Sequence, residues 1–184
     1  METSIVISGF GGQGVLFAGQ LLAYAGMDNG RFVTWIPSYG PEMRGGTANC
    51  TVIISTDPVG APIVAQPDIA LVFNQPSYEK YVDMVKPGGL LVINSSIVTV
   101  DEPRTDLNVV EIPANGLAGE FGTIKMLNMA MIGAMLAHHD VLPITALEDA
   151  LRAHLPARKQ QFLSGNLEVL HAGARAATKE TALT

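Results

Sequence analysis

The chain contains 184 residues, with 11 lysines and arginines against 17 aspartates and glutamates, which gives a formal net charge of −6. This length suits one domain of ordinary size, so we treat residues 1–184 as a single domain. Hydrophobic residues make up 48% and charged residues 15% of the chain, a composition that excludes a disordered or coiled-coil protein. The acidic balance argues against a nucleic acid partner, because binding a phosphate backbone needs clustered basic residues.

Cys50 is the single cysteine of the chain. One thiol excludes an intrachain disulfide framework, and it also excludes an iron–sulfur cluster held by this chain alone, which normally takes four thiolates. We interpret Cys50, which lies in a strand pattern, as a buried thiol in a cytoplasmic protein. The longest apolar stretch, residues 129–137, is shorter than the roughly 18 residues of a membrane span, and no signal peptide is predicted, so we expect no membrane association.

The first third of the chain alternates between strand and helix patterns. Residues 4–8 are rich in β-branched side chains and predict a strand, whereas residues 13–29 carry apolar side chains at helical spacing. Residues 31–36 and 47–55 predict two further strands. Between them, residues 37–46 contain two prolines and three glycines and predict a loop.

The remaining elements point to a parallel sheet covered by helices. The unbroken apolar runs 69–73 and 90–93 are typical of strands buried on both faces, and a helix beginning near Pro76 lies between them. The later elements are a strand over 108–112, helices over 124–138, 145–153 and about 158–176, and a flexible tail after about 177. The order predicts an α/β fold, a three-layer αβα domain with a mostly parallel Rossmann-like sheet.

A glycine-rich turn joins the first predicted strand to the first predicted helix. Gly9-Phe10-Gly11-Gly12-Gln13-Gly14 satisfies the pattern G-x-G-x-x-G in the strand-to-helix context that the pattern requires. Unpaired amides at the positive end of a helix can bind a phosphate or a carboxylate, although a tight turn needs glycine in any case. An acidic residue that would bind a ribose is missing from the predicted end of the second strand, near Trp35, which disfavours an NAD(P) dehydrogenase.

Neutral hydrogen-bonding residues follow the predicted strands. Asn74, Asn94 and Asn115 each come directly after or close to a strand end, where ligands bind in sheets of this kind. The candidate cofactor-binding residues are Gly9, Gly11, Gly12, Gln13, Gly14, Asn74 and Asn94. The asparagines could equally cap the strand ends. No nucleophile beside a base, carboxylate pair or metal-ligand spacing is evident, so no catalytic residue and no metal site are predicted.

The loop over residues 37–46 is the most unusual segment of the sequence. It combines fixed prolines with flanking glycines, and such a loop can present side chains rigidly. We predict that Ser38, Tyr39, Glu42 and Arg44 face a subunit interface or an active site. The alternative is an ordered connector in which Glu42 and Arg44 pair locally.

Three further groups of residues favour structural roles. Met126, Met129, Met131 and Met135 belong to a helix suited to packing in a core or at a subunit interface. His138 and His139 end that helix and are adjacent, so they do not share a face for chelation. The basic residues near the C-terminus, Arg158 and Lys159 among them, are more typical of a solvated helix face than of an anion site.

Two motifs together give the sequence a family resemblance. The glycine pattern of residues 9–14 combined with Pro37-Ser38-Tyr39-Gly40-Pro41-Glu42-Met43-Arg44-Gly45-Gly46-Thr47-Ala48-Asn49-Cys50 resembles the gamma subunit of 2-oxoacid:ferredoxin oxidoreductases. The resemblance covers most of the chain and includes residues 74–77, Asn128 and residues 166–173. The second motif is closer to 2-oxoglutarate and branched-chain 2-oxoacid members than to pyruvate members.

The resemblance implies an enzyme complex that oxidatively decarboxylates a 2-oxoacid with coenzyme A and yields acyl-CoA, carbon dioxide and reduced ferredoxin. It implies thiamine diphosphate with Mg²⁺ and iron–sulfur clusters on other chains, and alpha, beta and ferredoxin-like delta subunits as partners. This chain would contribute to assembly and to the coenzyme A side of the active site, would be inactive alone, and could form a homodimer when isolated. The alternative is a free-standing nucleotide- or CoA-binding Rossmann-like protein.

Overall fold

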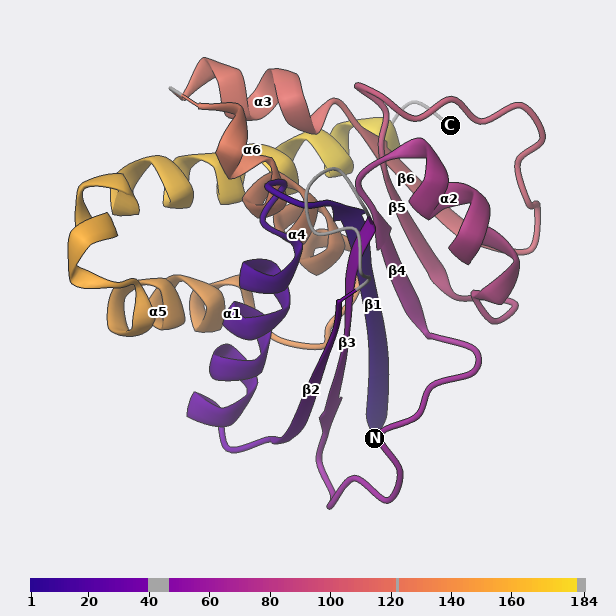
Figure 1. The fold of residues 1–184 in the computed structure, drawn as a ribbon, viewed down its shortest axis with the longest axis horizontal. Coiled ribbons are helices and arrows are strands. Elements are labelled where there is room, and N and C mark those ends of the chain that lie inside the picture. The colour runs from indigo at the N-terminus through magenta and orange to yellow at the C-terminus, as the bar shows by residue number, and fades with distance from the viewer. Residues whose placement is uncertain (40–46, 122, 182–184) are drawn as a thin grey trace.

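The computed structural model describes residues 1–39, 47–121 and 123–181, which form a six-stranded sheet in the order β2-β3-β1-β4-β5-β6 (Figure 1). The strands are β1 (Glu2–Phe10), β2 (Phe32–Tyr39), β3 (Thr47–Ser55), β4 (Ile69–Val72), β5 (Leu90–Asn94) and β6 (Asn108–Ile112). Strands β1, β4, β5 and β6 are parallel, and β3 is antiparallel to both of its neighbours, β1 and β2. Five of the six strands therefore run in one direction, which confirms the mostly parallel sheet.

Helices cover both faces of the sheet and make the three predicted layers (Figure 1). The helices are α1 (Val15–Asp28), α2 (Gln75–Tyr81), α3 (Ala114–Glu120), α4 (Leu127–His138), α5 (Ile144–His154) and α6 (Leu163–Thr181), with 3₁₀ turns η1 (Val82–Met84), η2 (Ile124–Met126) and η3 (Ala157–Phe162). Helices α1, α4, α5 and α6 share the larger hydrophobic core on one face. Helix α2 covers the parallel strands on the other face, where Tyr78 and Tyr81 pack against Val6 and Val72.

Helices α4 and α6 pack backbone against backbone. A Cβ atom added at Gly133 would lie 2.0 Å from the carbonyl oxygen of Leu170, and one added at Gly173 would lie 2.1 Å from the carbonyl oxygen of Ala130. The methionine-rich helix α4 is consequently buried along almost its whole length, with Met129, Met131 and Met135 fully enclosed. Of its two proposed roles, these methionines fill the core of this chain.

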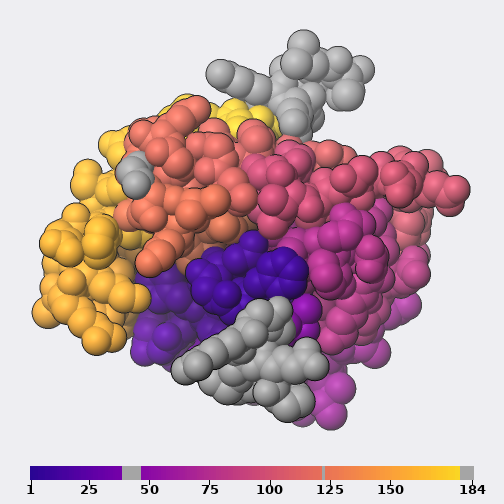
Figure 2. All heavy atoms as spheres, turned by 45° about the horizontal axis from the view of Figure 1, so that its top comes forward, coloured from indigo at the N-terminus to yellow at the C-terminus, as the bar shows by residue number. Residues whose placement is uncertain are grey.

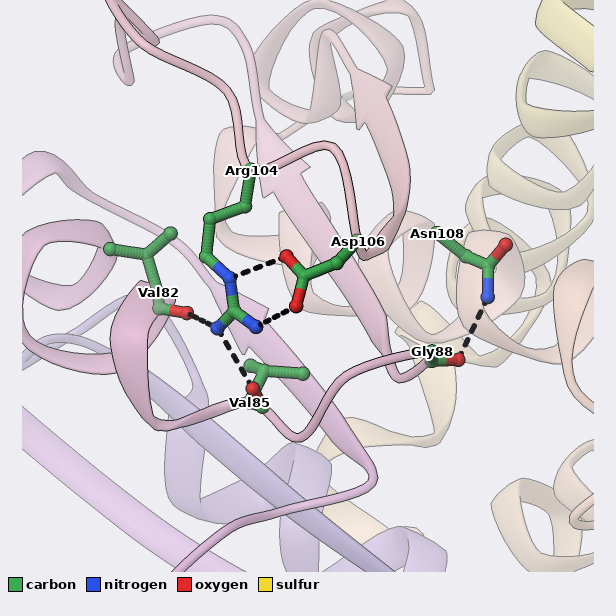
Figure 3. Close-up of polar contacts among 6 residues, drawn as sticks. All are labelled: Val82, Val85, Gly88, Arg104, Asp106 and Asn108. Carbon is green, nitrogen blue, oxygen red and sulfur yellow. Dashed lines mark hydrogen bonds and ion pairs between the residues drawn. The ribbon is translucent and has the colours of Figure 1, made fainter.

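The connection from β5 to β6 carries no helix and is held by side-chain contacts instead (Figure 3). The Arg104 guanidinium donates to the carbonyl oxygens of Val82 and Val85, each at 2.8 Å. The same guanidinium pairs with Asp106, whose backbone carbonyl accepts from Gly88 N at 2.7 Å. The connection is thereby fixed to the end of η1 and to the turn before β5.

Several expectations from the sequence need correction. Residues 37–39, predicted to lie in the loop, belong to β2, since Pro37 is tolerated in an edge strand that has a free side. Helix α3 was not predicted, because its sequence ANGLAGE contains two glycines and resembles a turn. Helix α6 continues to Thr181, past the predicted start of the flexible tail. The helix predicted over about 158–176 begins instead as the 3₁₀ turn η3.

The sheet order also corrects the argument about the missing ribose acid. The expectation of an acidic residue near Trp35 assumes a sheet in which β2 adjoins β1, so that the end of β2 lies beside the glycine loop. In this structure β3 lies between them, so the residues around Trp35 are one strand further from the loop than assumed. The absence of an acid near Trp35 therefore says little about a nucleotide at the loop.

Cys50 lies in the core, as predicted. It is fully buried in β3, and its Sγ donates to the carbonyl oxygen of Val15 at 3.6 Å. Burial away from water disfavours the thiolate and raises the pKa of Cys50 to about 12. Among the described residues, no helix is both long and apolar enough to cross a membrane.

Candidate ligand-binding site

The carboxyl ends of β1 and β4 meet at a switch in the sheet. The chain leaves β1 into α1 on one face and leaves the neighbouring β4 into α2 on the other face. Adjacent strands whose following helices diverge leave a crevice where ligands bind in open α/β sheets. The glycine loop follows β1 here, and in Figure 2 it surfaces in indigo between the orange segment that contains α3 and η2 and the magenta segment that contains α2.

At least three positions of the glycine loop require glycine: Gly12, whose φ of 96° is positive, and Gly14 and Gly9. Gly14, the N-cap residue of α1, has φ of 78° in the left-handed region, which residues with a Cβ atom rarely adopt. Gly9 lies so close to β4 that an added Cβ would be 2.8 Å from Cβ of Phe73. Among the described residues, no side chain caps the N-terminus of α1, so its first amides are left for other acceptors.

A partly buried polar network lies next to the loop. The Oε1 atom of Gln13 accepts from the Phe10 amide at 2.6 Å, and its Nε2 donates to the Phe73 carbonyl at 3.3 Å. Asn94 donates to the same carbonyl at 3.2 Å and to Oδ1 of Asn115 at 3.1 Å. Gln13 and Asn94, predicted to bind a cofactor, thus support the loop from the interior.

Asn74 acts in this structure as a helix cap. Its Oδ1 accepts from the Ser77 amide at 2.9 Å at the start of α2, and Ser77 in turn shares a hydrogen bond of 2.9 Å with Ser8. Asn74 is buried, and its Nδ2 has no hydrogen-bond partner among the residues that the structure describes. Of the two interpretations of the asparagine, the capping role is the one that the geometry displays.

On its outer side the glycine loop borders a pocket of about 250 Å³. The pocket is lined by Gly12, Gly14, Phe17, Thr123, Lys125, Met126, Asn128, Leu155, Lys159, Phe162 and Asn166. Three helices begin at this pocket, because its lining includes the first turn of α1, of α4 and of α6. None of these first turns contains an acidic residue, so the positive ends of three helix dipoles are not neutralised from within.

Two lysines add full positive charge to the same pocket. Lys125 belongs to η2, and Lys159 belongs to η3, where its Nζ lies 5.5 Å from the centre of the Phe17 ring. Among the described residues neither lysine forms an ion pair. Sequence reasoning placed Lys159 on a solvated face; its side chain is indeed exposed, but it also borders the pocket.

The structure divides the predicted site residues into three groups. Gly12 and Gly14 line the pocket, and the neighbouring Gly11 is exposed. Gly9, Gln13, Asn74 and Asn94 lie in the layer behind them and do not line it. Ser38 is an exposed residue of β2 paired with Asn49, and Tyr39 ends β2 opposite Ala48. Glu42 and Arg44 lie outside the described residues.

The chemistry of the pocket suits an anionic ligand with an apolar part. Helix N-termini and lysines bind phosphate or carboxylate groups, whereas Phe17, Leu155 and Phe162 offer apolar surface to a ring or chain. No group of three or more histidines, cysteines or carboxylates that could hold a metal ion occurs in the part of the chain that the structure describes. The arrangement therefore suits the binding of a molecule that has a phosphate or carboxylate group and an apolar part.

Sequence comparison connects this geometry with known proteins. The profile of the family described as pyruvate ferredoxin/flavodoxin oxidoreductase matches residues 4–176. The chain is 40% identical over 183 residues to ketoisovalerate oxidoreductase subunit VorA of Methanothermobacter marburgensis, covering 97% of this chain and 37% of VorA. The chain thus spans little more than a third of the length of that relative.

Other relatives match the chain over most of their own length. 2-Oxoglutarate synthase subunit KorC of Methanocaldococcus jannaschii is 35% identical over 160 residues, which is 85% of each chain. Among solved structures, the gamma subunit of a keto/oxoacid ferredoxin oxidoreductase from Geobacter sulfurreducens has a TM-score of 0.83 and 30% identity, with 96% of this chain and 99% of that chain covered. The fold is thus shared with a gamma subunit from end to end.

Proposed function

Since the chain belongs to the pyruvate ferredoxin/flavodoxin oxidoreductase family, we propose that it is the gamma subunit of a multisubunit 2-oxoacid:ferredoxin oxidoreductase. The complex would oxidatively decarboxylate a 2-oxoacid with coenzyme A and release acyl-CoA and carbon dioxide, with ferredoxin as electron acceptor. The names of the relatives support 2-oxoglutarate or a branched-chain 2-oxoacid as the substrate. The match to subunits rather than to complete enzymes supports a role inside a larger assembly.

The remaining parts of the enzyme would lie on other chains. Thiamine diphosphate with Mg²⁺ and the iron–sulfur clusters would be carried by alpha, beta and ferredoxin-like delta subunits. The chemistry of this chain agrees with that division, because its one cysteine is fully buried and its thiol pKa is raised to about 12. Its own contribution would be assembly of the complex and binding of coenzyme A.

The pocket beside the glycine loop is the observation that carries this proposal. Coenzyme A ends in an adenosine with phosphate groups, and the pocket offers two lysines and three helix N-termini to negative charge. Phe17 and Phe162 provide apolar surface against which an adenine ring can pack. The proposal therefore places the phosphorylated end of coenzyme A in this pocket.

Binding at that end would serve the reaction by positioning the thiol. The described residues that line the pocket include no carboxylate, histidine or cysteine, and Lys125 and Lys159 contribute charge to binding. Interactions with a remote, unreacting part of a substrate restrict its motion and so raise the effective concentration of the reacting group. In this account the chain anchors coenzyme A while the acyl transfer takes place on the partner subunits.

Isolation of the native complex tests this function. The tagged chain is purified from its own cells, the co-eluting proteins are identified, and dye reduction that depends on both a 2-oxoacid and coenzyme A is measured. We expect thiamine-binding and cysteine-rich subunits to co-elute with activity toward 2-oxoglutarate or a branched-chain 2-oxoacid. A chain that elutes alone, is inactive, and binds coenzyme A or a nucleotide by itself would contradict the proposal and favour a free-standing binding protein.

A further inference from the structure

Asn128 connects the beginnings of two helices at the pocket. The residue lies in the first turn of α4 and is 3% exposed. Its Nδ2 donates to the carbonyl oxygen of Gly14 at 3.1 Å, and its Oδ1 accepts from the Met129 amide at 3.1 Å. One carboxamide thus joins the N-cap of α1 to the first turn of α4, across 114 residues of sequence.

The joined helix ends would otherwise repel each other. The first turns of both α1 and α4 border the pocket, and the positive ends of two helix dipoles are unfavourable neighbours. An Asn side chain can bridge them without adding charge, so the positive potential that attracts an anion is kept. A carboxylate at the same place could not donate to the Gly14 carbonyl and would also neutralise the positive charge of the pocket.

The bond from Asn128 also determines how the glycine loop is oriented. The Gly14 carbonyl accepts from the Ala18 amide at 2.9 Å, and Asn128 supplies its second hydrogen bond. Both lone pairs of this oxygen are then used, so the carbonyl is fixed in the wall of the pocket. A larger residue at position 14 would clash with this side chain, because a Cβ atom at Gly14 would lie 2.5 Å from Nδ2 of Asn128.

We infer that Asn128 is a positioning residue, which holds the glycine loop and the first turn of α1 in the orientation that binds the phosphate end of coenzyme A. This inference rests on the proposed function. Asn128 acts through the loop: it fixes the amides and keeps the site free of negative charge. Its loss should therefore weaken the binding of coenzyme A more than it slows the chemical step.

The chain contains a matched control at the other end of the sheet. Asn108 donates its Nδ2 to the carbonyl oxygen of Gly88 at 2.9 Å, as Figure 3 shows. Gly88 has φ of 78°, the same value as Gly14, so the two pairs share residue types, bond type and backbone conformation. Asn108 does not line the pocket at the glycine loop. The Asn108–Gly88 pair differs from the Asn128–Gly14 pair in its exposure to solvent and in its position at the opposite end of the sheet.

The experiment compares Asn128→Ala, Asn128→Asp and Asn108→Ala in the purified complex. We expect Asn128→Ala to raise the KM for coenzyme A about tenfold, as loss of one well-placed hydrogen bond implies, with kcat and the KM for the 2-oxoacid within about twofold. Asn128→Asp keeps the side-chain shape but removes the donor and adds negative charge, so its KM should rise further. Asn108→Ala should leave the KM for coenzyme A unchanged.

Each outcome separates the inference from the function on which it rests. If the wild-type complex does not require coenzyme A, the proposed function fails before the variants are compared. If it does, and Asn128→Ala changes the KM no more than Asn108→Ala, the positioning role is wrong. Equal loss of affinity for coenzyme A and for the 2-oxoacid would also contradict it. Should Asn128→Ala not assemble, the uncharged Asn128→Leu variant, whose side chain is of similar size but has no donor, decides by the same comparison.

Discussion

Similar hydrogen bonds occur at the two ends of the sheet, but the charged side chains around them are paired at one end and unpaired at the other among the described residues. At the amino ends of the strands, Asp68 forms an ion pair with Lys86 and accepts from the Ser4 amide at 2.8 Å, while Arg104 pairs with Asp106. At the carboxyl ends, two lysines and three helix N-termini surround the pocket without an ion pair from any described residue. The charges at the amino ends thus neutralise each other, whereas the positive charges at the carboxyl ends remain available to a ligand.

This difference in charge pairing shows how a structural contact can be distinguished from a binding site within one fold. Both ends contain an asparagine bonded to the carbonyl of a left-handed glycine, so neither residue type nor backbone conformation distinguishes them. What distinguishes them is the balance of charge around the contact. Unneutralised charge beside a pocket costs stability through repulsion and is therefore informative about ligands.

The largest effect is expected from removing the charge at the carboxyl end. The double variant Lys125→Ala with Lys159→Ala should raise the KM for coenzyme A about 100-fold, because each charge-assisted contact contributes about 1.4 kcal/mol, a factor of ten. The thermal midpoint should not fall, since neither lysine has an acidic partner among the described residues. Steady-state kinetics and thermal unfolding of the complex measure both quantities.

The matched variant for this prediction is Lys86→Ala at the amino end. Lys86 pairs with the partly buried Asp68, so its loss should lower the thermal midpoint and leave the KM for coenzyme A unchanged. A double lysine variant that unfolds early with an unchanged KM would assign the lysines to structure, and the contrast between the two ends would be lost.

A smaller effect is expected from adding one methyl group at each left-handed glycine. Gly14→Ala and Gly88→Ala both carry the backbone cost of a residue with a Cβ atom at φ of 78°, about 1 kcal/mol of unfolding free energy. Only at Gly14 does the new Cβ meet a neighbour, Nδ2 of Asn128, while at Gly88 nothing lies within 4 Å.

Gly14→Ala should therefore raise the KM for coenzyme A about tenfold in addition to its effect on stability. Gly88→Ala should change stability alone, measured as the free energy of unfolding in denaturant. A KM that rises equally in both variants would mean that general destabilisation, rather than the geometry of the loop, controls binding.

The third prediction concerns acid sensitivity at the amino end. Burial would raise the pKa of Asp68, but hydrogen bonds from Lys86 and Ser4 outweigh it and hold the pKa below the ordinary value of 3.8. A carboxyl group with a lowered pKa stabilises the fold above its unfolded pKa, and this contribution is lost as the pH falls through the folded value. Asp68→Asn should then cost about 1 kcal/mol at pH 7, a figure already reduced for solvent screening.

The same variant supplies its own pH control. The difference in unfolding free energy between the wild type and Asp68→Asn should shrink as the pH falls below about 4, because protonated Asp68 no longer has an advantage over asparagine. Affinity for coenzyme A at pH 7 should be unaffected. A stability difference that stays constant from pH 7 to pH 3 would show that the charge of Asp68 contributes nothing.

The smallest effect is expected at Cys50, which lies in the larger hydrophobic core on one face of the sheet. With a pKa of about 12, roughly one thiol in ten thousand is ionised at pH 8, and the side chain is fully buried. Alkylation by iodoacetamide at pH 8 should be absent in the wild type and in every folded variant above. Rapid alkylation of the native protein would contradict the packing around β3.

Sequence reasoning was most successful where a pattern is local. The apolar runs over 69–73 and 90–93 and the strand over 108–112 were predicted almost residue for residue, because buried parallel strands leave an unbroken signature. The insertion of β3 between β1 and β2 was not predictable in this way. Strand order depends on long-range pairing, which the periodicity of a segment does not encode.

Of the candidate site, only the glycine loop and the polar strand ends were predictable from the sequence. The glycine loop was recognised from its spacing and lies at the pocket, and Asn74 and Asn94 do lie at strand ends, yet the pocket itself is completed by residues 123–166. Lys125 and Lys159 have no motif of their own, and each resembles an ordinary surface lysine in sequence. Their significance comes from the convergence of three helices, a property of the tertiary fold.

A structure of the purified complex with coenzyme A bound would test the central claim most directly. We expect the phosphate groups of coenzyme A to lie in the pocket between Gly14, Lys125 and Lys159, with Asn128 still bonded to the Gly14 carbonyl. Coenzyme A bound elsewhere in the complex, with this pocket filled by a side chain of another subunit, would contradict the account and make the pocket a subunit contact.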